Sequence, residues 1–475
     1  MPRLSGATSF SYVTRKKKKK SMSNNQKQQH RDSIDFGKEN IPRLFVKLFI
    51  PTLLGLLFGA LLNVADGIFV GRGVGSDALA AVNIAAPIFI IGTATALLFG
   101  SGVSVVAAVH LSHGKTKAAN INTTQAFTIS VALMGIVSLL IACFPSSVAH
   151  LFGGEGRIMP YARDYLLAVF PVPVLTQVLF IGMFVLRLDG APKFAMAANI
   201  TTSVLNIFLD WLFVFPLEQG IRGAAIATTL SEVVGAAMIL VYMCFMSKRL
   251  HFYRPKFTRK SLILTARNVG YMAKVGLPSF IGEGAISVMI VTGNYMFTPR
   301  LHEDGVAAYS VCCYLFPLVF MFGNAIAQSS LPIISYNHGQ GNDARIRKAL
   351  RLSLVMAFVL GLLMTLAGVF CATPMVSLFL QPGSSAWYIC TEGLPLFSIS
   401  YVFFTINVVV IGYLQSIERS RSATFFMLLR SCLLLLPAFV ILPHCIGNSG
   451  LWLAVPASEL LTTVVASMWL RLKEK

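Results

Sequence analysis

Residues 199–210, Asn-Ile-Thr-Thr-Ser-Val-Leu-Asn-Ile-Phe-Leu-Asp, place a carboxylate inside a long apolar segment. In an α-helix, Asn199, Ser203, Asn206 and Asp210 fall on one face, because their spacing is i, i+4, i+7 and i+11. The remaining surface is mostly Ile, Val, Leu and Phe. A charged polar stripe is costly to expose to lipid, so it predicts a helix that faces protein or a water-filled cavity. The alternative is a stripe that only forms hydrogen bonds between helices.

The composition around this stretch is typical of a membrane protein. Of the 475 residues, 55% are hydrophobic and 12% are charged, whereas soluble domains carry about 25% charged residues. Each membrane-spanning helix needs about 20 mostly apolar residues. We therefore predict an all-α polytopic membrane protein. The eight cysteines lie in or beside apolar segments without a CxxC pair, so we interpret them as small hydrophobic residues.

The formal net charge of +20 lies mainly in the N-terminal tail and in alternate loops between apolar segments. The basic loop residues follow predicted spans 2, 4, 6, 8 and 10: Lys115, Lys117, Lys193, the stretch 247–268, Arg345, Arg347, Lys348, Arg419 and Arg421. Loop Lys and Arg mark the cytoplasmic side of membrane proteins. This pattern predicts a multi-pass protein of the cell (inner or plasma) membrane with both termini in the cytoplasm. We expect contact with the lipid bilayer and no nucleic-acid partner.

Hydropathy predicts twelve transmembrane helices. They cover approximately residues 43–70, 78–110, 120–144, 160–187, 191–215, 222–246, 270–297, 305–334, 348–372, 386–416, 422–444 and 450–471. Four regions follow from these spans: a disordered basic cytoplasmic tail (1–40), a first lobe (41–246), a basic cytoplasmic linker (247–268) and a second lobe (269–475).

The two lobes share an internal repeat with an offset of 227 residues. Matching pairs are Pro51 with Pro278, Gly223 with Gly450, and Ser231-Glu232 with Ser458-Glu459. Six helices separate the copies, so both halves have the same orientation and the pseudo-twofold axis runs along the membrane normal. Secondary transporters use such repeats to move one half against the other. Asp210 falls on Pro437 at this offset, so the acidic stripe belongs to the first half alone.

Four residues of the first half form a candidate cation site. Asp66 lies near the outer end of span 1, Asn206 and Asp210 lie toward the outer end of span 5, and Thr228 lies about two turns into span 6. Two close carboxylates do not both stay ionised easily without a cation between them. Their oxygen atoms, with a carboxamide and a hydroxyl, could hold Na⁺ or H⁺ as the coupling ion. A purely structural cluster is the alternative, and we expect no other cofactor.

A second set of polar residues is predicted to line a substrate cavity: Asn63, Asn199, Ser203, Glu283, Ser287 and Asn407. Glu283 lies near the middle of span 7 and could attract a cationic substrate, bind a second proton or only form packing contacts. The buried charges identified in this way are acidic, which favours a cationic cargo. The recurrence of Glu232 and Glu459 at the repeat offset indicates a role shared by both halves, such as helix packing or a loop contact.

Several of these segments resemble the multidrug and toxic compound extrusion (MATE) family. The similarity covers about residues 43–471 and rests on Asp66-Gly-Ile-Phe-Val-Gly, Asn206 with Leu209-Asp210, the run from Gly223 to Thr228, Gly276-Leu277-Pro278-Ser279, and Asn337-His338-Gly339. The resemblance implies a V-shaped pair of six-helix lobes that exports organic cations by alternating access. It also implies that Asp66, Asn206, Asp210 and Thr228 bind the coupling cation. Asn407 stands where some members carry an acid, and Leu62 where some carry a tyrosine.

The predicted function is secondary active export of amphipathic, mostly cationic compounds in exchange for Na⁺ or H⁺, by a monomer. One alternative is a flippase for lipid-linked oligosaccharides, whose cavity should be lined by Arg and Lys. A non-transporting scaffold would tolerate Asn in place of Asp66 and Asp210. No catalytic constellation and no P-loop lysine motif is recognisable in the sequence, so we do not expect an enzyme.

Overall fold

The computed structural model describes residues 34–254 and 258–474, and these residues are almost entirely helical. The first half contains α2 (Ile41–Gly73), α3 (Ser76–Ser112), α4 (Thr116–Cys143), α5 (Pro145–Leu151), α6 (Met159–Val169), α7 (Val172–Asp189), α8 (Pro192–Val214) and α9 (Gly220–Val241). The second half contains α10 (Arg259–Gly339), α11 (Asp343–Phe370), α12 (Ala372–Ser377), α13 (Ser385–Ser398), α14 (Ser400–Ser416), α15 (Ser420–Leu428), α16 (Leu435–Ile446) and α17 (Ser449–Glu474).

The helices confirm the predicted twelve-span layout. Within the described residues, eleven helices are long and apolar enough to cross a membrane. One of them, the 81-residue α10, contains two spans, because the backbone at His302 is non-helical (φ 54°, ψ −153°). Three spans are interrupted: α6 and α7 form span 4, α13 and α14 form span 10, and α15 continues through the π-helix η3 (Leu429–Leu433) into α16 as span 11.

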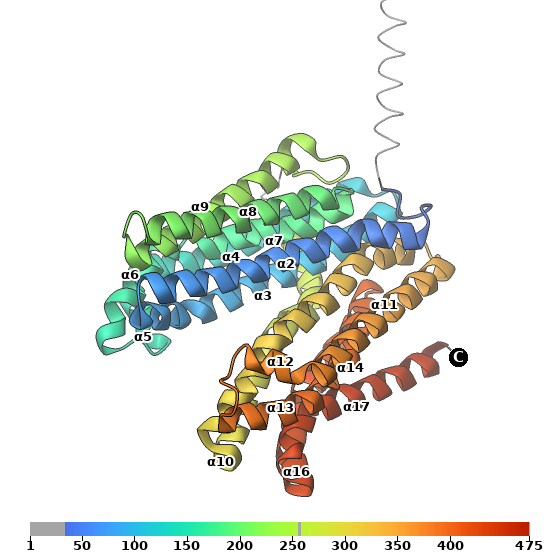
Figure 1. The fold of residues 1–475 in the computed structure, drawn as a ribbon. Helices are drawn as coiled ribbons and strands as arrows, with labels where there is room; N and C mark the ends of the chain where they lie inside the picture. Colours follow the sequence, from blue (N-terminus) through green and yellow to red (C-terminus); the bar gives the residue numbers. More distant parts are fainter. Residues whose placement is uncertain (1–33, 255–257, 475) are drawn as a thin grey trace, which may run out of the picture.

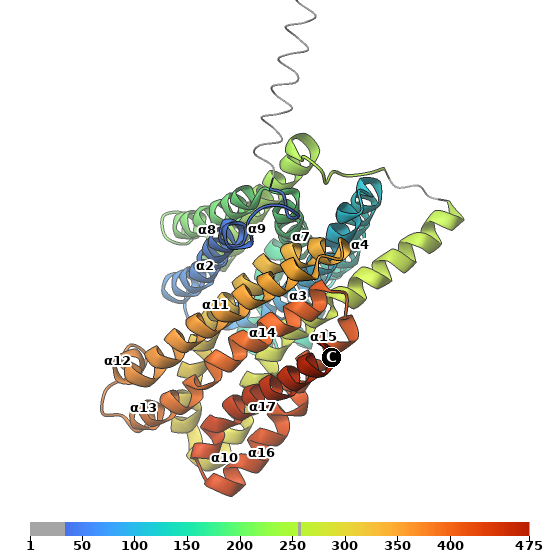
Figure 2. The ribbon, with the colours of Figure 1, turned by 90° about the vertical axis from the view of Figure 1, so that its right-hand side faces the viewer.

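The two halves form separate lobes arranged as a V. In Figure 1 the N-lobe, α2 to α9, is drawn in blue to green and the C-lobe, α10 to α17, in yellow to red. The lobes converge where the described chain begins and spread apart toward the ends that carry α5, α6, α12 and α16. Figure 2 views the molecule from the right-hand side of Figure 1, with α2, α8 and α9 of the N-lobe above α13, α16 and α17 of the C-lobe. We call the two sides of the molecule the closed end and the open end.

Glycines allow the lobes to approach closely between α3 and α10. A Cβ atom added to Gly102 would lie 2.2 Å from the carbonyl oxygen of Met272, and one added to Gly276 would lie 1.8 Å from that of Leu98. Real Cβ atoms do not come so close to backbone atoms. The absence of a side chain at these two positions therefore sets the distance between the lobes.

The predicted tail boundary needs correction. Most of residues 1–40 lie outside the described residues, but residues 34–40 are described and packed. Phe36 is buried against Tyr336, with ring centroids 5.9 Å apart, and its carbonyl oxygen accepts hydrogen bonds from Asn337 and Arg345. The apolar side chain of Phe36 therefore anchors the chain before α2 begins.

The predicted linker is also shorter than expected. Helix α10 begins at Arg259, inside the predicted range 247–268, and Thr258 caps it by accepting a hydrogen bond from Ser261 N (3.3 Å). The start of the linker is fixed by Asp189, which accepts backbone hydrogen bonds from residues 248–250 at 2.7–2.9 Å. Hydropathy did not reveal the helical start, because the first turns of α10 are rich in basic residues.

Candidate functional site

The polar stripe of α8 points into the N-lobe, as its spacing predicts. Asn206 and Asp210 are 1% and 0% exposed, and Ser203 is fully buried. On the opposite face, Phe208 and Trp211 are about half exposed, at 53% and 48%. This is the face that would contact lipid, so α8 is an amphipathic span whose polar side is enclosed by protein.

Asn206 links the acidic stripe to helix α9. In the amide orientation that satisfies both of its polar atoms, Asn206 donates to Asp210 Oδ2 at 2.9 Å and accepts from the backbone N of Thr228 at 3.2 Å. The Thr228 hydroxyl donates to the carbonyl of Ala224 at 3.1 Å, and one lone pair of its oxygen remains for another partner. Three of the four predicted cation-site residues therefore lie together.

Asp66 completes this cation cluster from α2. The carboxylates of Asp66 and Asp210 lie close enough for their charges to affect each other, and the buried Tyr165 of α6 lies near both. Asp66 Oδ1 and Asp210 Oδ1 are buried, and no described residue forms a hydrogen bond with either atom. A buried carboxylate oxygen without a partner is costly. A proton or a cation bound to these two oxygens would remove that cost. Tyr165 was not predicted, because a single tyrosine in an apolar helix has no distinguishing spacing.

The six residues predicted for the substrate cavity do not share one location. Asn63 is exposed on α2, and Asn199 donates to the carbonyl of Gly55 at 2.9 Å, joining α8 to α2. Ser203 lies inside the N-lobe, and Ser287 is half-buried on α10. Asn407 is 1% exposed inside the C-lobe. Glu283 lines a cavity.

The cavity beside Glu283 lies between the lobes and has a volume of about 50 Å³. Its walls come from α3, α7, α10, α14, α15 and η3. The polar lining includes a carboxylate, a guanidinium, three carboxamides and two hydroxyls: Glu283, Arg430, Asn324, Gln328, Gln415, Ser101 and Ser279. Apolar residues such as Phe184 and Phe320 complete an amphipathic lining, around a space much smaller than the roughly 300–1,000 Å³ of ligand pockets.

The cavity also corrects the expectation that the buried charges are acidic. Arg430 is 6% exposed, and its guanidinium lies 4.4 Å from the Phe404 ring centroid. Arg187 is 5% exposed and donates to Gln328 Oε1 of the opposite lobe at 2.8 Å. A basic residue within an apolar segment is itself a signal of function, and that signal was present in the sequence at both positions.

Glu459 is the counterion of Arg430. The Arg430 Nη2 atom lies 2.5 Å from Glu459 Oε1, and Asn407 donates to Glu459 Oε2 at 2.7 Å. Thr463 in turn donates to Asn407 Oδ1 at 2.9 Å. The contacts of Asn407 are therefore with the ion pair and with Thr463, and they do not place its amide in the predicted substrate cavity.

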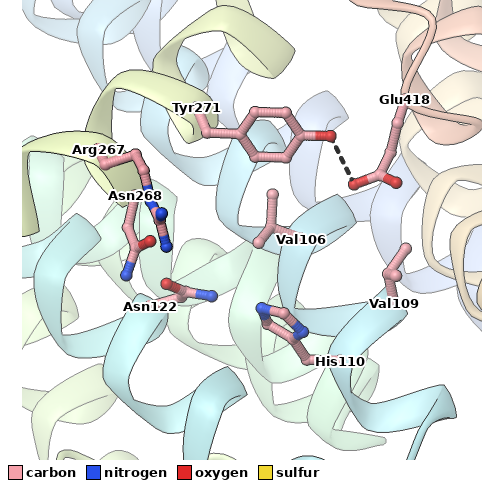
Figure 3. A pocket seen from close by; sticks show the side chains of 8 residues that line it. All are labelled: Val106, Val109, His110, Asn122, Arg267, Asn268, Tyr271 and Glu418. Atoms are coloured by element: carbon pink, nitrogen blue, oxygen red, sulfur yellow. Dashed lines mark hydrogen bonds between the residues drawn. The ribbon is translucent and has the colours of Figure 1, made fainter. Parts of the chain in front are cut away.

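A larger pocket of about 370 Å³ lies near the closed end (Figure 3). It is lined by Val106, Val109, His110, Asn122, Arg267, Asn268, Tyr271 and Glu418, and Tyr271 donates to Glu418 Oε1 at 2.9 Å. None of these residues was predicted as a site. The lining carries groups of both charge signs, Arg267 and Glu418.

Comparison with known proteins identifies the family. The family model MatE matches the chain twice, over residues 51–212 and residues 278–440. An FAD transporter of Shewanella oneidensis is 26% identical over 430 residues, which cover 89% of this chain and 92% of that protein. The multidrug export protein MepA of Staphylococcus saprophyticus is 23% identical over 444 residues, covering 91% and 94%.

A solved structure confirms the fold. A mutant of VcmN, a MATE transporter of Vibrio cholerae, has a TM-score of 0.83 at 19% identity, over 92% of this chain and 98% of that chain. The two matches of the family model begin 227 residues apart, in agreement with the predicted repeat. Because these matches cover more than half of the sequence, the chain belongs to the MatE family of multidrug and toxic compound extrusion (MATE) transporters.

Proposed function

We propose that this protein is a secondary active antiporter that exports amphipathic, mostly cationic organic compounds in exchange for Na⁺ or H⁺. The observation that carries the proposal is the pair of buried oxygens, Asp66 Oδ1 and Asp210 Oδ1, that lack hydrogen-bond partners among the described residues. A bound proton or Na⁺ would satisfy them. The relatives named as multidrug export proteins support the same reading.

The energetic cost of the acidic site allows a bound ion to shift the conformational equilibrium of the protein. A charge within the membrane costs up to roughly 2.5–3.5 kcal/mol, the value at the bilayer centre on insertion scales. An ion that neutralises Asp66 or Asp210 can therefore shift an equilibrium between two lobe arrangements by up to about a hundredfold. Asp66 lies on α2, which contains Pro51 in its interior. Our mechanism is that ion arrival bends α2, narrows the N-lobe and releases the exported compound at the open end.

The loop charges support the orientation of this cycle. Helices that meet at the closed end are joined by the basic loops, including Lys115, Lys193 and Arg419. By the rule for loop Lys and Arg, the closed end and both termini face the cytoplasm. The open end then faces outward, from which a compound bound between the lobes would leave. We propose that a monomer carries out this cycle, since each chain holds both lobes and the cavity.

A second candidate function is export of an amphipath that carries an anionic group. The guanidinium of Arg430 lines the cavity between the lobes, and one relative is named an FAD transporter. A lipid-linked oligosaccharide also belongs to this class. Cationic cargo is favoured, because Arg430 already has Glu459 as its counterion whereas Glu283 forms no ion pair in the described part of the chain.

Dye efflux from proteoliposomes tests the function. The dyes are a cationic rhodamine methyl ester and its free acid, a zwitterion of nearly the same size. Imposed Na⁺ and pH gradients should each be applied to wild type and to Asp210→Asn. We expect one gradient to drive efflux of the ester and the substitution to abolish that response. Efflux of the free acid alone would favour the second candidate, and gradient-driven efflux that survives Asp210→Asn would contradict the assigned ion site.

A further inference from the structure

Equivalent glutamates in the two lobes differ in their ion-pair partners. In the C-lobe, Glu459 of α17 is neutralised by Arg430, with its Oε1 atom 3.0 Å from Nε and 2.5 Å from Nη2. Its counterpart in the N-lobe is Glu232 of α9, one repeat offset earlier. Glu232 Oε2 is buried, and none of the described residues forms a hydrogen bond or an ion pair with it.

The N-lobe has no basic residue where the C-lobe has Arg430. The repeat offset is 227 at the start of the two family matches and 228 at their end. The position equivalent to Arg430 is therefore Ser203 or Thr202, and neither side chain carries a charge. Ser203 Oγ is fully buried and, like Glu232 Oε2, has no hydrogen-bond partner among the described residues.

The register of α8 and α9 places Ser203 and Glu232 at one level. The two helices are antiparallel neighbours, and Asn206 of α8 is hydrogen-bonded to Thr228 of α9. One turn from this pair toward the closed end, α8 reaches Ser203 and α9 reaches Glu232. The helices stay in contact beyond this level, because a Cβ atom on Gly235 would lie 2.1 Å from Thr202 Oγ1.

We propose that Glu232 and Ser203 form a second binding site for a coupling cation, Na⁺ or H⁺, in the N-lobe. The mobile ion occupies the position that the guanidinium of Arg430 holds permanently in the C-lobe. A carboxylate and a hydroxyl supply the oxygen ligands that a hard cation prefers, and a proton would convert Glu232 into a hydrogen-bond donor for Ser203. The site lies one turn from Asn206 and Thr228 and two turns from Asp210, so it is separate from the ion position at the cation cluster.

This proposal rests on the proposed ion coupling, but a binding experiment tests it without transport. Purified protein in detergent is titrated with radioactive sodium at alkaline pH, and the number of ions bound per chain is counted. The proton alternative is tested without sodium by infrared difference spectra across a pH titration, which count protonated carboxylic acids. We expect Glu232→Gln to bind one Na⁺ fewer per chain than wild type or to lose one carboxylic-acid band.

Two further variants separate ion binding from a structural effect. Ser203→Ala should weaken cation binding several-fold without changing the number of ions at saturation. The double variant Glu459→Gln with Arg430→Gln makes the equivalent change in the C-lobe. It should bind as many ions as wild type, because in wild type Glu459 is neutralised by Arg430 and not by a bound ion.

The proposal is overturned if Glu232→Gln binds as many Na⁺ as wild type and keeps every carboxylic-acid band. A protein that shows the expected counts but no gradient-driven efflux would refute the antiporter function and leave the second cation site in place. If Glu232→Gln binds as many ions as wild type and gradient-driven efflux is normal, the second cation site is refuted and the antiporter function stands.

Discussion

Arg430 and Glu459 form a buried ion pair, 6% and 4% exposed, that joins η3 to α17 inside the C-lobe. Removing one partner of such a pair leaves an uncompensated charge and costs about 3–5 kcal/mol. We therefore predict that Glu459→Gln markedly lowers the midpoint of thermal unfolding in detergent.

The surface pair of Lys47 with Glu39 provides the control for this prediction. Its lysine side chain is 49% exposed, and exposed pairs contribute about 0–1 kcal/mol. Glu39→Gln should leave the unfolding midpoint nearly unchanged. Equal shifts for the two variants would show that the buried pair does not support the C-lobe.

The close approach of α3 and α10 gives a second prediction. Gly276→Ala would put a Cβ atom 1.8 Å from the Leu98 carbonyl oxygen, so the lobes must separate there. Overpacking of this kind costs about 1–3 kcal/mol. We expect reduced stability and slow dye efflux in proteoliposomes.

Gly270→Ala is the matched control, because nothing lies within 4 Å of a Cβ atom at this position of the same helix. Alanine is the better helix former by about 1 kcal/mol, so this variant should be as stable as wild type or more so. Normal efflux by Gly276→Ala would mean that the contact between Gly276 and Leu98 does not limit the transport cycle.

The sequence allowed the spans, the repeat and the inward face of α8 to be predicted, because these depend on hydropathy and on helical periodicity. Asp210 illustrates both the success and the limit. Its spacing identified the buried face, but spacing does not identify neighbours on other helices. Tyr165, which lies near both carboxylates of the cation cluster, could not be found in this way.

Local backbone irregularities could not be predicted from hydropathy, because they do not change the hydrophobicity of a segment. The π-helix η3 at Leu429–Leu433 and the break between α6 and α7 interrupt segments whose hydrophobicity is continuous. The extended start of α10 was missed because basic residues within a helix resemble a polar linker. Arg430 is a charge in an apolar span, but a guanidinium cannot be a ligand of a cation, so the pattern of cation ligands did not include it.

The hydroxyl of Thr228 gives a third prediction. If this oxygen is a ligand of the coupling cation, Thr228→Val removes it while preserving the shape of the side chain. A lost ligand or hydrogen bond of this kind is worth about 0.5–1.5 kcal/mol, so the apparent affinity for Na⁺ or H⁺ in dye efflux should fall about two- to tenfold.

The adjacent Thr229 provides an internal comparison. Its hydroxyl donates to the carbonyl of Ala168 at 2.7 Å, away from the acidic stripe of α8. Thr229→Val should therefore change stability more than ion affinity. A greater loss of ion affinity in Thr229→Val than in Thr228→Val would remove Thr228 from the cation site.

Glu283 gives the last prediction, which concerns the charge of the exported compound. Its carboxylate lines the cavity between the lobes together with Arg430, and a cationic cargo would be attracted to the acid that has no ion-pair partner. Glu283→Gln should raise the KM for the rhodamine methyl ester about tenfold, equivalent to about 1.4 kcal/mol of binding free energy. The KM for the zwitterionic free acid should change less, because the carboxylate of this dye is repelled by Glu283 and offsets the attraction of its cationic group.

Glu392→Gln provides the control. Glu392 is an exposed acid on α13, and its substitution should leave both KM values unchanged. If Glu283→Gln changes only the response to the Na⁺ or pH gradient and not the KM for either dye, Glu283 acts in ion coupling and not in cargo recognition.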